Sequence, residues 1–330
     1  MTRTREIVGS SSPTFSVVVC AYTLDRWDDV RAAVASLRRQ SRPVDEILLV
    51  VDHCPELYER AAAGLPGEVR VLASHERRGL SGARNTGVAA ARGEVVAFLD
   101  DDATADPDWH ARLAAGYGDP AVAGVGGLVR PWWTTGRPAW FPPEFDWVVG
   151  CSYRGLPEHP APVRNFIGAN MSFRRAEVLS AGGFRTDLGR VGRTPLGGEE
   201  TELCLRIAAR SPGAVLLYEP GAAVRHRVPG ARAQHTYFRA RCYAEGLSKA
   251  RVASLRGSRA ALASERAYLR SAVPRAFART LRPGTDGGPR VLAALCTGVG
   301  ATVAGYVVGR AGLLAGAVRR ARGEPAGDAP

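Results

Sequence analysis

Short apolar runs alternate with amphipathic segments along the first 130 residues. The segments between the runs carry apolar residues at helical spacing, as Trp27, Val30 and Val34 illustrate. Strands that alternate with helices predict an α/β fold with a Rossmann-like, mostly parallel sheet and helices on both faces. The apolar runs have the length of buried strands and lie at 15–23, 45–52, 69–74, 94–99 and 121–131.

The chain becomes less regular after residue 130. Residues 130–150 hold four of the six tryptophans together with several prolines. This composition favours a packed irregular loop, although aromatic rings also stack on sugars. A helix at 197–210 is expected next, followed by two strands at 214–220 and 222–228.

Beyond residue 230 the chain is first basic and then apolar. Residues 231–283 contain twelve Arg or Lys against two acids, which suits an anionic membrane surface, although a solvated face would look the same. The basic residues are not interleaved with aromatics as in nucleic-acid readers, so no nucleic acid is expected. Residues 291–309 carry no charge and approach the roughly 20 residues that cross a bilayer. Gly305 and Gly309 would allow close helix packing there.

These shifts in composition predict five segments. The 330-residue chain is 45% apolar, enough for a sizeable core, and its six cysteines are scattered, which favours reduced thiols and no zinc site. The expected segments are a mobile leader (1–13), an α/β domain (14–230), a basic helical membrane-surface region (231–289), an apolar membrane-associated helix (290–318) and a polar tail (319–330).

Polar groups stand at the ends of three predicted strands. The carboxyl ends of parallel strands meet at one edge of a sheet, where ligands bind. A capping turn would explain any one of these groups alone, but three converging strand ends predict a site. Adjacent aspartates there would suit Mg²⁺ or Mn²⁺ bridging to a diphosphate. The residues are Ala21, Tyr22, Thr23, Asp52, Asp100, Asp101 and Asp102.

Other candidates each have a plain structural alternative. Glu199 and Glu200 begin a helix, where acids favour the helix dipole, but an ionised carboxylate is also a general base. His226 is either a satisfied core histidine or a further metal ligand. Arg190 and Arg193 lie in a glycine-rich stretch and either recognise an acceptor phosphate or uronate, or are solvated.

Several motifs together resemble glycosyltransferase family 2. They are SVVVCAYTLDR, ILLVVD, GLSGARNTGVAAARGEVVAFLDDD, IGANMSFRR, GGEETELCLR and YEPGAAVRH, and they cover about residues 15–226. The resemblance implies the GT-A fold of nucleotide-sugar-dependent inverting enzymes. It implies that Ala21–Thr23, Asp52, Arg84, Asn85, Asp100 and Asp101 hold the nucleotide, usually uridine, and that Asp102 and His226 hold the metal.

The same resemblance places the general base on the Glu199–Glu200 pair, where the family more often has Glu-Asp. This leaves the choice between the two open, with Glu200 preferred. Asn170 in IGANMSFRR joins Arg190 and Arg193 as a candidate acceptor-binding residue. The Gln-x-x-Arg-Trp signature of processive synthases is missing, and the nearest stretch is RARCY at 239–243, so a single transfer is expected.

Two further stretches, WFPPEFDWVVGCSYRG and RCYAEGLSKA, are similar to a group of glucosyl-dolichyl-phosphate glucuronosyltransferases. That similarity implies a UDP-glucuronate-like or UDP-glucose donor, a glycan or polyprenyl-linked acceptor, and work at the cytoplasmic face of a bacterial membrane. Two alternatives stand beside this interpretation. One is a catalytically silent membrane-surface binding protein. The other is a sugar-phosphate nucleotidyltransferase, which normally has a Gly-rich loop where this chain has CAYTLDR.

Overall fold

The fold is built around one mixed sheet. The structure is a computed structural model that describes residues 12–190, 196–280 and 288–321. The strands are β1 (Phe15–Ala21), β2 (Glu46–Val51), β3 (Val69–Ala73), β4 (Val95–Asp100), β5 (Ala103–Ala105), β6 (Val122–Trp133), β7 (Ala161–Pro162), β8 (Asn170–Arg174) and β9 (Val215–Val228). Their spatial order is β3-β2-β1-β4-β8-β6-β9-β5, and β7 pairs with β9.

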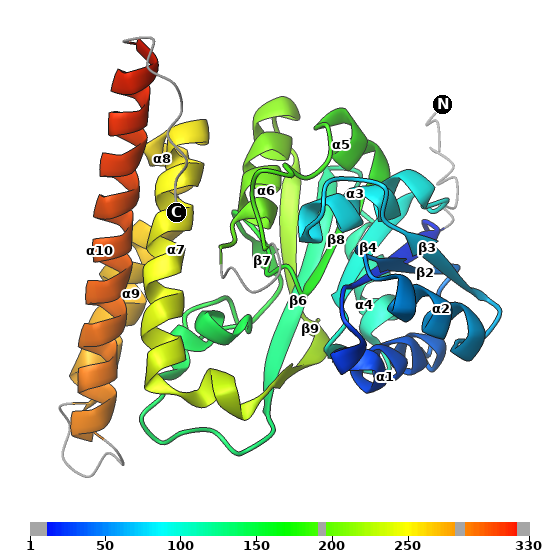
Figure 1. Ribbon diagram of the computed structural model, residues 1–330, viewed down its shortest axis with the longest axis horizontal. Coiled ribbons are helices and arrows are strands. Elements are labelled where there is room, and N and C mark those ends of the chain that lie inside the picture. Colours follow the sequence, from blue (N-terminus) through cyan, green and yellow to red (C-terminus); the bar gives the residue numbers. More distant parts are fainter. Residues whose placement is uncertain (1–11, 191–195, 281–287, 322–330) are drawn as a thin grey trace, which may run out of the picture.

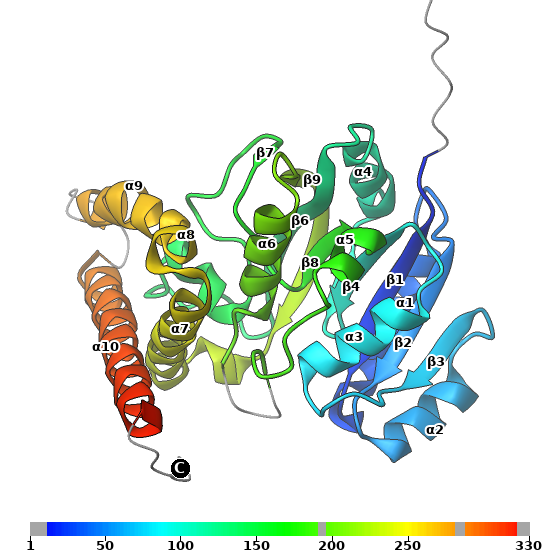
Figure 2. The same ribbon diagram turned by 90° about the horizontal axis from the view of Figure 1, so that it is seen from above.

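Helices cover both faces of this sheet (Figures 1 and 2). α1, α2 and α4 pack on one face and α3, α5 and α6 on the other, each with its own hydrophobic cluster. The helices are η1 (Leu24–Arg26), α1 (Trp27–Arg38), α2 (Pro55–Gly64), α3 (Leu80–Ala90), α4 (Trp109–Gly116), η2 (Pro143–Val149), α5 (Arg175–Ser180), α6 (Glu199–Arg210), η3 (Gly230–Ala233), α7 (His235–Arg256), α8 (Ser258–Ala261), α9 (Ala263–Thr280) and α10 (Gly288–Ala321).

The predicted α/β fold with helices on both faces is confirmed, and the central strands show why it forms. Alternate residues of β1 point to opposite faces: Val17 and Val19 join one hydrophobic cluster and Val18 joins the other. Because both faces are covered, the strand is apolar along almost its whole length. The β3-β2-β1-β4 half of the sheet is parallel, as predicted.

The other half of the sheet is more mixed than the sequence predicted. β8 runs antiparallel to both β4 and β6, and β5 and β7 run antiparallel to β9. β8 follows the long irregular segment 134–169 rather than a helical crossover, so it is free to enter in the opposite direction. The two strands predicted at 214–220 and 222–228 are one strand, β9, with a register shift against β6.

The tryptophan-rich segment is only partly irregular. Trp132 and Trp133 extend β6, and η2 (Pro143–Val149) forms a short helix within the predicted loop. Phe141, Phe145 and the ring of Trp133 pack into the larger hydrophobic cluster. The packing role expected of this segment is therefore present.

Beyond η3 the chain forms a helical layer beside the sheet domain (Figure 1), in which α7 and α10 lie side by side. Their backbones approach closely because glycines face the contact. A Cβ atom at Gly246 would lie 2.1 Å from the Thr302 carbonyl oxygen, and one at Gly305 would lie 2.0 Å from that of Tyr243. Length and composition alone would let residues 288–316 of α10 cross a membrane.

Candidate active site

The predicted strand-end groups meet at one edge of the sheet. β1 lies between β2 and β4, with Ala21 opposite Val51 and Cys20 opposite Asp100. The loop after β1, Asp52 after β2 and the aspartates at the end of β4 therefore lie at the same edge of the sheet, as the parallel arrangement predicts.

The three consecutive aspartates have three different environments. Asp100 is partly exposed, whereas Asp101 and Asp102 are 4% and 7% exposed. Asp101 accepts a hydrogen bond from Arg26 (2.7 Å), while its second carboxylate oxygen is buried without a partner among the described residues. Burial and the neighbouring charge of Asp102 raise the pKa of Asp101 to about 7. Asp101 is therefore held beneath the site rather than presented to it.

Asp100, Asp102 and His226 form a candidate metal site. One ligand atom from each lies within 4.8 Å of the others, and His226 Nε2 lies 3.0 Å from Asp102 Oδ1. The short strand β5 causes this meeting, since it follows Asp102 directly and pairs Ala103 with His226. Two carboxylates and an imidazole are donors that suit Mn²⁺ or Mg²⁺.

Asp102 and His226 each shift the pKa of the other. Burial alone would raise the pKa of Asp102, but His226, Arg26 and Arg232 hold it well below its usual value. Burial alone would lower the pKa of His226, but the Asp102 carboxylate raises it well above its usual value. Metal binding at this site would therefore release a proton from His226, because only the neutral imidazole is a ligand.

The Asp52 carboxylate already has two partners within the protein. Its carboxylate accepts a hydrogen bond from the backbone N–H of Gly79 (2.9 Å), the residue before α3, and lies 2.8 Å from His53 Nδ1. The helix-capping contact expected as the plain alternative is thus present. The neighbouring Tyr22 is 38% exposed, and the Arg26 guanidinium lies 5.5 Å from its ring centroid. The Thr23 hydroxyl accepts a hydrogen bond from Asp25 N–H.

Arg84 and Asn85, on α3, hold parts of the site together. Arg84 is 2% exposed and donates to Glu199 (3.0 Å) and to the Gly168 carbonyl (3.1 Å), and it lies 3.6 Å from Asp100. Asn85 exchanges two hydrogen bonds with the backbone of Phe184. Arg84 therefore joins the metal-site acids to the start of α6, whereas the Asn85 amide fixes a loop.

The two glutamates that begin α6 have different surroundings. Glu199 is 4% exposed and paired with Arg84, and its other carboxylate oxygen is buried with no partner among the described residues. Both glutamates line the cavity, but Glu200 is half-buried whereas Glu199 is buried. Burial and the charge of Glu199 raise the pKa of Glu200 to about 8. Glu200 is the better placed of the two to take a proton from a bound molecule.

The three candidate acceptor residues have separate outcomes. Asn170 is fully buried and saturated: it accepts from Trp109 Nε1–H (2.8 Å) and donates to the carbonyls of Leu128 and Ala222. It does not line the cavity, so the structure does not bring it to the site. Arg190 does line the cavity. Arg193 lies outside the described residues.

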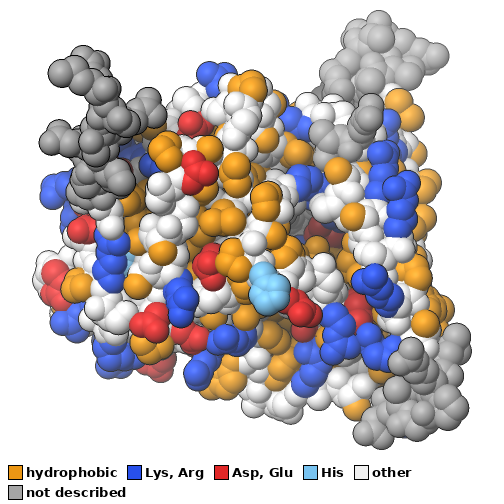
Figure 3. Space-filling model, turned by 180° about the vertical axis from the view of Figure 1, so that it is seen from behind, with side chains coloured by type: hydrophobic (Ala, Val, Ile, Leu, Met, Phe, Trp, Pro, Cys, Tyr) orange, Lys and Arg blue, Asp and Glu red, His pale blue; other side chains and the backbone are white. Residues whose placement is uncertain are grey.

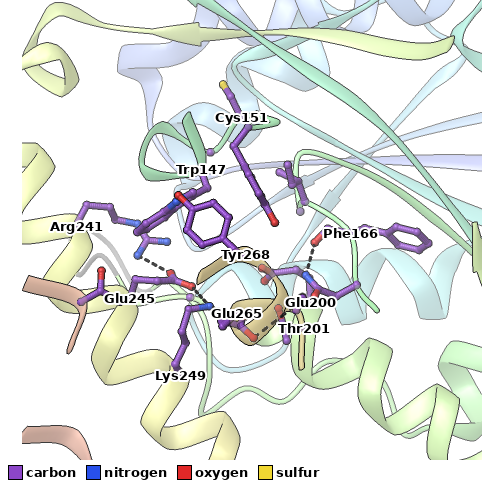
Figure 4. A pocket seen from close by; sticks show the side chains of 18 of the residues that line it. Trp147, Cys151, Phe166, Glu200, Thr201, Arg241, Glu245, Lys249, Glu265 and Tyr268 are labelled. Carbon is purple, nitrogen blue, oxygen red and sulfur yellow. Dashed lines mark hydrogen bonds and ion pairs between the residues drawn. The ribbon is translucent and has the colours of Figure 1, made fainter. Parts of the chain in front are cut away.

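A cavity of about 400 Å³ lies between the sheet domain and the C-terminal helices (Figure 4). Asp100, Glu200 and His226 line it from the sheet domain. The opposite wall includes Arg241, Glu245 and Lys249 from α7 together with Glu265 and Tyr268 from α9, and the close view shows the Lys249 ammonium between Glu245 and Glu265. We did not predict these residues for the site. A signal was present in the sequence: the two acids of the basic tract, Glu245 and Glu265, both lie here.

Comparisons with known proteins agree with this geometry. The sequence model for "Glycosyl transferase family 2" matches residues 16–178. The chain is 37% identical over 238 residues to glucosyl-dolichyl phosphate glucuronosyltransferase from Haloferax volcanii, covering 71% of this chain and 75% of that protein. It is 30% identical over 160 residues to pre-mycofactocin glycosyltransferase from Mycobacterium tuberculosis, covering 48% of this chain and 32% of that protein.

A solved structure gives the same fold. The mannosyltransferase from Pyrobaculum calidifontis in complex with GDP-Man and Mn²⁺ aligns with a TM-score of 0.56 at 21% identity, covering 92% of this chain and 87% of that chain. The likeness extends through the C-terminal helices as well as the sheet domain. Together with the family match and the Haloferax relative, it shows that this chain belongs to glycosyltransferase family 2 and is a glycosyltransferase with the GT-A fold.

Proposed function

We propose that this glycosyltransferase moves a sugar from a UDP-linked donor, UDP-glucuronate or UDP-glucose, to a hydroxyl of a lipid-linked acceptor, with inversion at the anomeric carbon. The observation that carries the proposal is that Glu200 lines the same cavity as Asp100 and His226, two members of the candidate metal site. A base and a cation seat on one cavity wall are what a direct displacement of a diphosphate needs.

The donor would occupy the crevice at the strand ends. Tyr22 and Asp52, which follow β1 and β2, would meet the base and ribose, and Asp100, Asp102 and His226 would hold Mn²⁺ or Mg²⁺. When bound, the ion would neutralise charge on the departing diphosphate. The Mn²⁺ in the Pyrobaculum structure supports this choice of ion, although the donor there is GDP-Man.

Glu200 would act as the general base. It takes the proton of the acceptor hydroxyl as the hydroxyl oxygen forms its bond to the anomeric carbon, and the bond from that carbon to the diphosphate breaks with its electron pair on the diphosphate. A raised pKa suits this role, because a base works best when its pKa lies near the working pH. Glu199, which is held by Arg84, would raise the pKa of Glu200.

The acceptor is proposed from the C-terminal helices and from the Haloferax relative, whose name specifies a glucosyl-dolichyl phosphate acceptor. α10 contributes Val299 and Val303 to the cavity, while Val307 and Leu314 are 58% and 61% exposed. Figure 3 shows hydrophobic side chains along the edge formed by the C-terminal helices, with Lys and Arg beside them. This pattern suits an anionic membrane surface, and we place the enzyme at the cytoplasmic face of a cell membrane.

The test is sugar transfer by the purified full chain with Mn²⁺. UDP-glucuronate, UDP-glucose and GDP-mannose are offered with farnesyl-phosphate-linked glucose as acceptor, and the product anomer is read by NMR. We expect a UDP-sugar to be used and its anomeric configuration to invert. Glu200→Gln should lose transfer while UDP and Mn²⁺ still raise the thermal midpoint. Glu59→Gln, an exposed change on α2, is the matched control. A retained anomeric configuration, or full activity in Glu200→Gln, would contradict the mechanism.

A further inference from the structure

One row of ion pairs along the cavity wall joins α7 and α9 to Arg164 of the sheet domain, and its cations outnumber its carboxylates. Arg241 pairs with Glu245 (2.9 Å), and Lys249 pairs with both Glu245 (3.0 Å) and Glu265 (2.6 Å), as Figure 4 shows. Arg164 continues the row by pairing with Glu265 (2.6 Å). Burial alone would raise the pKa of both carboxyl groups, but their cationic partners lower each to about 2. Both are therefore ionised at neutral pH, and three cations against two carboxylates leave one positive charge.

Two more arginines add to this surplus. Arg190 lines the same cavity and forms no ion pair within the described part of the chain. Arg232 is 9% exposed and lies 3.8 Å from Asp102 through one nitrogen, while its Nη1 is buried without a partner among the described residues. Arg241 is 8% exposed, and its Nε is likewise buried and unpaired. Guanidinium groups stay charged, so buried donors of this kind require an anion.

The positive charges of Arg190, Arg232 and Arg241 repel one another. Burial and the positive charges of Arg241 and Arg232 lower the pKa of Arg190. Like charges held together in a buried wall are costly unless a ligand neutralises them. Arg241 also interacts electrostatically with Glu200, so the arginines border the place where the acceptor hydroxyl would lie.

Beyond the arginines the cavity becomes apolar. Leu262 and Leu269 from the α8–α9 region and Val299 and Val303 from α10 line it there. Leu269 and Val303 are 48% and 52% exposed, so this apolar wall continues to the surface. A ligand that fills the cavity therefore meets cations near Glu200 and hydrocarbon further out.

We propose that Arg190, Arg232 and Arg241 form a binding site for the phosphate of an amphiphilic lipid phosphate, whose hydrocarbon chain leaves along α9 and α10. This rests on the proposed function, in which that phosphate links the acceptor sugar to its lipid. A guanidinium donates two parallel hydrogen bonds to phosphate oxygens, which fixes orientation as well as affinity. A uronate carboxylate on the donor sugar offers similar oxygens, and the experiment separates the two sources.

The experiment is calorimetric titration of the full chain in detergent with farnesyl phosphate and, as the uncharged match, farnesol. We expect farnesyl phosphate to bind more tightly than farnesol. Arg190→Gln and Arg241→Gln should each weaken farnesyl phosphate binding by about tenfold to a hundredfold and leave farnesol binding unchanged. Arg239→Gln, an exposed change on α7 close to Arg241, should alter the binding of neither compound. UDP with Mn²⁺ should raise the thermal midpoint equally in all four proteins.

Three outcomes would overturn the site. Equal weakening of farnesol and farnesyl phosphate would show that no phosphate contact was lost. Loss of the UDP response with intact farnesyl phosphate binding would assign the arginines to the donor diphosphate. If the variants raise the KM for UDP-glucuronate more than the KM for UDP-glucose, relative to the wild type, and leave farnesyl phosphate binding unchanged, the arginines would be assigned to the donor carboxylate.

Two controls keep the proposals separate. Arg190→Gln breaks no ion pair within the described residues, so it remains informative if Arg241→Gln, which removes one of the two cationic partners of Glu245, unfolds. The thermal midpoint without ligand reports folding of each variant. If the wild-type protein binds farnesyl phosphate through these arginines but transfers no sugar, the proposed function fails and the phosphate site stands.

Discussion

The pH dependence of transfer should report the environment of Glu200. Burial and the adjacent Glu199 carboxylate raise the pKa of Glu200 to about 8, against an ordinary value of 4.5. The charge of Arg84 acts in the opposite direction, but Arg84 is committed to Glu199 at 3.0 Å. Glu245 on the facing helix also raises the pKa of Glu200. A base that must be ionised to act is therefore mostly protonated at neutral pH.

The size of the effect follows from this value. With a pKa of about 8, roughly one Glu200 in ten is ionised at pH 7 and about nine in ten at pH 9, so kcat/KM should rise about tenfold over that interval. An unperturbed carboxyl group would already be ionised at pH 6 and would give a flat profile above it. The sign is fixed because a raised carboxyl pKa delays ionisation, so activity is lost as the pH falls through about 8.

The assay is kcat/KM against pH, which reports groups of the free enzyme, at saturating Mn²⁺. Glu199→Gln removes the charge that raises the pKa of Glu200 and releases Arg84, so both changes favour the ionised base. The acid limb should move to lower pH. UDP affinity is measured over the same range, so that titration of the metal ligands is recognised separately. An acid limb below pH 6 in the wild type, or one that Glu199→Gln leaves in place, would refute this account.

Three further outcomes test other parts of the structure. Asp102→Asn should abolish the Mn²⁺-dependent rise in thermal midpoint with UDP, and a rise that persists would remove Asp102 from the metal site. Asn170→Ala removes the acceptor of the Trp109 indole N–H and one donor to each of two backbone carbonyls. It should lower the unfolding free energy by about 2–4 kcal/mol without a selective rise in acceptor KM, which urea titration and kinetics would check. Gly305→Ala should destabilise by about 1–3 kcal/mol because its Cβ meets α7, whereas Gly312→Ala, with open space, should be neutral or stabilising; thermal unfolding compares them.

Local patterns were sufficient to predict the first half of the fold. β1, β2 and β4 are apolar along most of their length, and the helices between them carry one apolar face, so each element is defined by its own residues. β8 is different, because five residues at Asn170–Arg174 carry little periodic signal and pair with strands far away in the chain. Its direction follows from tertiary pairing, which no local pattern contains.

The candidate site also has one part that local patterns predict and one part that depends on tertiary pairing. Asp52 and Asp100–Asp102 follow strand ends, and strand ends of a parallel sheet must meet, so their proximity was predictable. The contact of Asp102 with His226 depends on β5, a three-residue strand whose pairing with β9 joins positions far apart in sequence. Asn170 was predicted to face an acceptor, yet its amide is consumed by Trp109 and two backbone carbonyls, which only the packed structure reveals.

The boundary predicted near residue 230 rests on a change in composition, and the cavity is lined from both sides of it. Glu200 and Arg190 stand on one wall and Arg241 and Val303 on the other. The close contact of α10 with α7 depends on Gly305, where no side chain separates the backbones. α10 is thereby fixed against the helix that carries Arg241. An acceptor in this cavity would be held at once by the helix that bears the base and by the apolar helix. The basic tract, whose charge alone suggested only attraction to a surface, therefore also builds half of the proposed acceptor site.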